Sequence, residues 1–76
     1  MTYSKKQFGI ELLKEIERNY DVVRLSRWAH SKFFENCRDL EEGLREIMMQ
    51  IIAMEEGPEF EIPRDELRSL AISLTN

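Results

Sequence analysis

Few side chains in this 76-residue chain could act as a catalytic nucleophile or a general base, because it contains one histidine, His30, and one cysteine, Cys37. Their spacing of seven residues would place them on one side of a continuous helix, where an imidazole can activate a thiol. Cys37 falls in a predicted break between helices, however, and no third group orients the imidazole. We therefore expect a buried structural thiol and a partly buried histidine between helices, not a catalytic pair.

The sequence also lacks the patterns that bind metals, phosphates and cofactors. A zinc site would need further cysteines or histidines, and the carboxylates do not have the spacing of a calcium-binding loop. The three glycines are isolated, so no glycine-rich loop can cradle a phosphate or support an oxyanion. We expect no catalytic residues, no metal site and no cofactor, and the sequence predicts that the protein is not an enzyme.

The segment of residues 55–61 is the best candidate for a binding site, because four acidic side chains there surround an aromatic one. These residues are Glu55, Glu56, Glu59 and Glu61 around Phe60. The first two acids end a predicted helix, whose negative C-terminal pole disfavours each carboxylate by about 0.3–1 kcal/mol. Two interpretations are open. Cations elsewhere in the chain neutralise the acids and the aromatic plugs the end of the bundle, or the segment is an acidic contact site for a basic partner.

Trp28 is the second candidate for partner binding. On a helical wheel of residues 22–36 it projects among Arg24, Lys32 and Glu35, away from the apolar stripe of that helix. Large aromatic side chains that lie outside a core are enriched at protein interfaces. We therefore predict that Trp28 contributes to a contact with another protein.

These candidates must be positioned by helices, because apolar residues recur at helical spacing through most of the chain. The sequence predicts an all-α fold, a compact four-helix bundle-like single domain over residues 1–76. Caps and helix-breaking residues divide it into helices near 5–19, 22–36, 40–56 and 64–75.

The helix boundaries rest on capping signals. Ser4, Asp21 and Asp39 are the expected N-terminal caps of the first three helices. Gly57 predicts a left-handed cap at the end of the third helix. Residues 59–62 alternate between polar and apolar side chains like a short extended segment.

The second and third helices have the widest apolar surfaces. The main stripe of helix 22–36 consists of Val22, Leu25, Ala29 and Phe33, widened by Val23 and Phe34. The stripe of helix 40–56 consists of Leu40, Leu44, Ile47, Met48, Ile51, Ile52 and Met54, with Met49 and Ala53 as a further pair on the opposite side. A helix as apolar as the third lies at the centre of a fold or at a subunit interface.

Composition and charge narrow the functional class. The formal net charge is −4, with 42% hydrophobic and 34% charged residues, and no stretch is long and apolar enough for a membrane span or a signal peptide. With a single thiol, these features predict a cytoplasmic protein with no membrane contact. Residues 1–38 carry eight basic and five acidic side chains, or +3, whereas residues 39–76 carry three and ten, or −7. We expect these complementary halves to face each other or the acidic half to meet a basic partner.

Three functions are compatible with these features. The first is a small noncatalytic protein that acts through protein contacts, as a homodimer formed through helix 40–56 and Trp28, because a chain this short builds only a marginal core. The second is an acidic inhibitor or adaptor of the immunity or antitoxin type, which masks a basic partner. The third is DNA binding through Arg24, Arg27 and Lys32, which the negative net charge disfavours.

Overall fold

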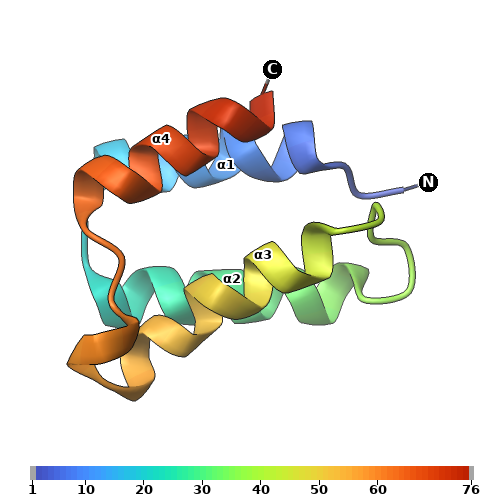
Figure 1. Ribbon diagram of the computed structural model, residues 1–76. Helices are drawn as coiled ribbons and strands as arrows, with labels where there is room; N and C mark the ends of the chain where they lie inside the picture. The colour runs from blue at the N-terminus through green and yellow to red at the C-terminus, as the bar shows by residue number, and fades with distance from the viewer. Residues whose placement is uncertain (1, 76) are drawn as a thin grey trace.

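The structure, a computed structural model, describes residues 2–75 (Figure 1). Within that range the chain forms helices and no strand, which confirms the predicted all-α fold. The elements are α1 (Lys5–Arg18), α2 (Val22–Asn36), α3 (Leu44–Ile52), the 3-10 helices η1 (Ala53–Glu56) and η2 (Pro58–Phe60), and α4 (Arg64–Thr75).

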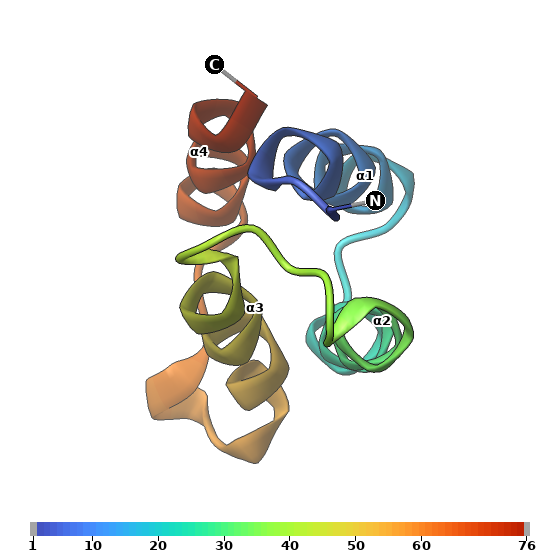
Figure 2. The same cartoon turned by 90° about the vertical axis from the view of Figure 1, so that its right-hand side faces the viewer.

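The helices form two layers. α1 packs against α4, and α2 packs against α3 and η1, so that the end-on view shows one pair above the other (Figure 2). The core between the layers takes fully buried side chains from every α-helix, among them Phe8 of α1, Leu25 of α2, Ile51 of α3 and Leu67 of α4. The predicted bundle-like arrangement of four helices is therefore confirmed.

The first two helices begin at the predicted caps. Ser4 Oγ accepts a hydrogen bond from a first-turn amide of α1 at 3.0 Å, and Asp21 Oδ1 accepts one from Arg24 N at 3.1 Å. The Arg24 guanidinium then reaches back to α1, where it donates to the Glu15 carboxylate and to the carbonyls of Glu15 and Asn19. A cation at the negative end of α1 is favourable, and these bonds hold the corner between the two helices.

The third helix begins later than predicted. α3 starts at Leu44, and its N-cap is Gly43, whose φ of +88° lies in the left-handed region that favours glycine. Asp39 does not cap it: Tyr3 N donates to Asp39 O at 2.7 Å, and Glu41 N donates to Tyr3 O at 3.0 Å. Because these bonds pair residues 39–41 with the N-terminal segment, the backbone there does not join the helix. A contact between segments distant in sequence overrides the local capping signal.

The end of the third helix also differs from the prediction. Its last turn is η1, and Gly57 has φ 173° and ψ 161°, which is extended backbone and not a left-handed cap. The predicted extended segment 59–62 begins as a 3-10 turn in which Phe60 N donates to Gly57 O at 3.0 Å, and Glu61 is extended. Short 3-10 turns are common at helix ends. Here they turn the chain back toward α4 (Figure 1).

α2 has a different buried face from the one expected. Arg24, Trp28 and Lys32, spaced by four residues, lie along the side of α2 that meets α1. Arg24 forms an ion pair with Glu15 at 2.5 Å, and Lys32 forms one with Glu11 at 3.5 Å. Between them, the ring of Trp28 stacks on that of Phe8, with the ring centroids 5.4 Å apart. The prediction that Trp28 projects away from the core is therefore wrong, because α2 packs toward α1 as well as α3.

The other flank of α2 is exposed. Val23 and Phe34, which the sequence assigns to a widened apolar stripe, are 45% and 72% exposed. His30 and Cys37 are exposed as well, so the expected partly buried histidine and buried thiol are also wrong. Turning Trp28 toward α1 turns this flank toward solvent, because the two lie on different sides of one rigid helix.

Candidate functional site

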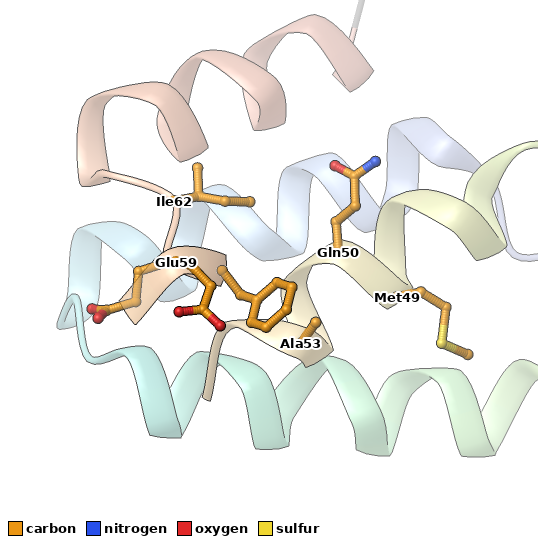
Figure 3. Close-up of a pocket in the computed structure, with 7 residues that line it drawn as sticks. Met49, Gln50, Ala53, Glu59 and Ile62 are labelled. Atoms are coloured by element: carbon orange, nitrogen blue, oxygen red, sulfur yellow. The ribbon is translucent and has the colours of Figure 1, made fainter. Parts of the chain in front are cut away.

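An open groove lies between the outer face of α3 and the segment that returns from η2 toward α4 (Figure 3). Its volume is about 470 Å³. The lining residues are Met49, Gln50, Ala53, Glu59, Phe60, Glu61 and Ile62. We call this feature the acidic groove, because the two carboxylates are its charged lining residues.

The groove exists because α3 is apolar on two faces. Met48 and Ile51 are buried in the core, whereas Met49 is 38% exposed and Ala53 is half-buried on the outer side. The sequence contains this signal, as Met49 and Ala53 are four residues apart and share a face. Gln50 projects from the same helix toward α4, as Figure 3 shows. The outer face of α3 therefore supplies the groove's apolar floor.

The returning segment supplies the opposite wall. η2 places Phe60 at the groove with 47% of its surface exposed, so this ring does not plug the end of the bundle. The next part of the chain is anchored by Tyr20, whose hydroxyl donates to the carbonyl of Ile62. Burial, and secondarily the charge of Glu61, raises the pKa of the Tyr20 hydroxyl above its ordinary value of 10, so this donor stays protonated beyond the pH at which an exposed tyrosine ionises.

The structure brings together three of the six residues predicted to bind a partner. Glu59, Phe60 and Glu61 line the acidic groove. Glu55 instead forms an ion pair with Arg27 at 3.8 Å and lines a second hollow beside α2, which shares Glu61 with the groove. Glu56 is exposed outside the groove. Trp28 lies against α1 and is not part of the site. The other lining residues, Met49, Gln50, Ala53 and Ile62, were not among the predicted binding residues, because only the return of η2 brings them opposite Phe60.

The expected pairing of a basic half with an acidic half occurs at one place only among residues 2–75. Arg27 with Glu55 joins the two halves in the predicted sense. The other ion pairs are Arg24 with Glu15 and Lys32 with Glu11, both within the first half, and Arg68 with Glu17, in the opposite sense. Glu59 and Glu61 have no ion pair within the described part of the chain. The groove therefore keeps a negative charge that no ion pair among residues 2–75 neutralises.

The main apolar stripe of the third helix is not available to a second copy. Leu44, Met48 and Ile51, at the centre of that stripe, are fully buried in the core. The helix is thus central in the fold, and only its outer face, at Met49 and Ala53, is left for a contact with another molecule. The predicted homodimer through this helix stays a prediction.

The groove offers apolar and acidic groups that a ligand could contact. An exposed thioether and an aromatic ring can contact an apolar side chain, and the carboxylates beside them can accept hydrogen bonds from cations. Among residues 2–75, no group of three or more His, Cys, Asp or Glu side chains is placed to hold a metal ion. No helix within this range combines the length and apolarity needed to cross a bilayer.

Comparison of the chain with protein-family models, with curated proteins and with solved structures finds no match in any of the three.

Proposed function

We propose that the protein is a noncatalytic interaction domain whose acidic groove binds a basic segment of another protein. The observation that carries the proposal is the juxtaposition of Met49 and Phe60, both partly exposed, with two carboxylates that have no cation within the described chain. Exposed apolar side chains rimmed by one sign of charge are typical of protein contact sites. An acidic inhibitor or adaptor is the class of protein that this surface favours.

The proposed ligand is an amphipathic helix or strand with one large apolar side chain and flanking lysines or arginines. Its apolar side chain would contact Met49, Ala53 and Phe60, and its cations would meet Glu59 and Glu61. Such charges chiefly raise the association rate and exclude acidic partners, whereas the apolar anchor supplies most of the affinity. Binding should therefore weaken as salt concentration rises.

DNA binding through α2 has less support from the structure than from the sequence alone. Arg24 and Lys32, two of the three cations proposed to contact phosphates, are held by Glu15 and Glu11 of α1. Arg27 remains 77% exposed on its side chain, and one cation is too few for a phosphate-binding surface. Titration of a fluorescent DNA duplex at low salt should show no binding.

The cytoplasmic location stays a prediction from the single thiol and the composition.

The groove can be tested with defined peptides. We would measure the fluorescence anisotropy of labelled amphipathic helices that share one apolar face and carry either lysines or glutamates around it. The basic peptide should bind and the acidic one should not. Replacing Glu59→Lys and Glu61→Lys together should weaken binding at least about tenfold, the effect of losing about 1.4 kcal/mol of interaction.

A matched variant controls for total charge. Glu35→Lys with Glu42→Lys also changes the formal net charge from −4 to 0, because each substitution adds two positive charges. Both of these residues are exposed and lie outside the groove. The control should bind the basic peptide nearly as well as the wild-type protein at physiological salt. Equal loss in the two double variants would mean that overall charge, and not the acidic groove, determines binding.

A further inference from the structure

The outer face of α2 has apolar side chains at both ends. Val23 and Phe34, which are 45% and 72% exposed, are eleven residues apart, or about three helical turns. They therefore lie on one face of the helix, separated by about 16 Å along its axis. Arg27 and His30 occupy the same face between them and are also exposed. This arrangement forms a continuous exposed stripe that the fold itself does not cover.

A hollow lies beside the first end of this stripe. It has a volume of about 260 Å³ between the start of α2 and the 3-10 segments. Its apolar lining includes Val22, Val23, Met54 and Pro58, and its acidic lining consists of Glu55 and Glu61. We call it the α2 hollow. An apolar side chain with a neighbouring cation would complement it.

The other end of the stripe carries an apolar side chain and a neighbouring cation of this kind. The ring of Phe34 projects into solvent and is supported by an edge contact with His30, whose ring centroid lies 5.6 Å away. Arg38 follows Phe34 by four residues, just beyond the end of α2, and is exposed. The C-terminal end of α2 therefore carries an apolar projection with a basic neighbour.

We propose that the protein forms a homodimer in which α2 packs antiparallel against α2 of a second copy. In this arrangement Phe34 of each protomer enters the α2 hollow of its partner beside Val23. A two-fold axis between Arg27 and His30 relates the two contacts, and because the projection and the hollow are on one rigid helix, both contacts form at once. Arg38 of each protomer then approaches the acidic lining of the other hollow.

A second copy is the occupant that these features favour. The projection and the hollow have opposite charge at their rims, and their spacing on one helix face is the same in each protomer by symmetry. Arg27, which would lie near the axis, is already paired with Glu55, which limits repulsion between the two copies. Glu61 lines both the α2 hollow and the acidic groove, but the other carboxylate of the hollow, Glu55, and its apolar lining lie outside the groove. The inference rests on Phe34, Val23 and the α2 hollow and does not require that the acidic groove bind a ligand.

The first test is the oligomeric state. Sedimentation equilibrium from low micromolar to near-millimolar concentration should show a monomer–dimer equilibrium for the wild-type protein. Phe34→Asp should raise the dimer dissociation constant at least about tenfold, as loss of an interface anchor does. At low concentration, where both proteins are monomeric, its circular dichroism and melting temperature should not change, because Phe34 is 72% exposed in the monomer. Ile72→Asp, at a 40% exposed position of α4, should leave the dimer intact.

The second test distinguishes the direction of packing. A nitroxide on Cys37, which is exposed and is the only cysteine, reports the distance between protomers by pulsed electron paramagnetic resonance. When position 23 faces 34, position 37 faces 20, so antiparallel packing separates the two labelled cysteines by about 25 Å along the helices. Parallel packing would bring them together at the interface. A monomer at all concentrations, a dimer that Phe34→Asp does not weaken, or a short distance between the labels would overturn the proposal.

Discussion

The indole of Trp28 stacks on the ring of Phe8, with the ring centroids 5.4 Å apart and an angle of 18° between the planes. This contact joins α2 to α1 and lies between two ion pairs, Arg24 with Glu15 and Lys32 with Glu11. Trp28 is thus part of the packing between the two layers. It has a structural role in this packing, although its charged neighbours on a helical wheel make it resemble an interface residue.

Truncating Trp28 should therefore affect stability. We expect Trp28→Ala to lower the free energy of unfolding by about 2–3 kcal/mol, somewhat less than for a fully buried aromatic residue. Urea denaturation followed by far-ultraviolet circular dichroism would measure it, since the substitution removes the tryptophan fluorescence. Binding of the basic peptide by the folded variant should be unchanged. Unaltered stability with lost binding would return Trp28 to the candidate contact residues.

Substitution by aspartate should have opposite effects on folding at the two apolar faces of α3. Ile51→Asp should unfold the protein, because an unpaired carboxylate would occupy the core at a fully buried position. Met49→Asp, two residues earlier, should fold normally, because that side chain is partly exposed. It should nevertheless weaken peptide binding by removing apolar contact area from the groove. Thermal melts and anisotropy on both variants would check this, and unfolding of Met49→Asp would contradict the assignment of the outer face.

Two glycines should respond differently to alanine. A Cβ atom at Gly9 would lie 2.7 Å from Leu74 Cβ and 2.8 Å from the Ala71 carbonyl oxygen, so α1 and α4 would have to move apart. We expect Gly9→Ala to cost about 1–3 kcal/mol of stability, despite the better helix propensity of alanine. At Gly57 the added atom would meet only the Glu59 side chain, at 3.5 Å. Gly57→Ala should be neutral or slightly stabilising in the same denaturation experiment.

Stability should fall at alkaline pH. Burial raises the pKa of Tyr3, helped by its 2.7 Å hydrogen bond to Glu11 and by the charges of Glu11 and Glu35. The pKa of Tyr20 is also raised. Above about pH 10 the unfolded chain releases these protons while the folded protein keeps them, so the unfolded state binds fewer protons and the free energy of unfolding decreases with pH. Below that pH the tyrosines contribute no pH dependence.

A tyrosine variant isolates this effect. Tyr3→Phe removes the group with the larger shift and should flatten the decrease in stability measured by urea denaturation between neutral and strongly alkaline pH. At neutral pH the variant should lose only the contribution of one hydrogen bond, about 0.5–1.5 kcal/mol. An equally steep alkaline decrease in the variant and the wild-type protein would show that Tyr3 does not titrate with unfolding.

Local signals predicted what depends on local contacts. Ser4 and Asp21 cap their helices as expected, because a cap satisfies amides within three residues. The predicted start of the third helix was wrong, because Tyr3, which is distant in sequence, pairs with residues 39–41. The residue pattern around Asp39 does not indicate that contact.

The candidate site illustrates the same division. The acidic residues near Phe60 are visible in the sequence, and so is the pair of Met49 and Ala53, but only the turns of η1 and η2 bring them to one groove. The wheel of α2 places Trp28 on a polar side, and only the packing of α1 makes that side internal. Helical periodicity and composition determine that the chain is all-α, acidic and amphipathic, because these properties depend on residues a few positions apart. Where a helix has apolar residues on more than one side, only the tertiary structure determines which side is buried in the core and which is exposed, because burial depends on which helices pack together.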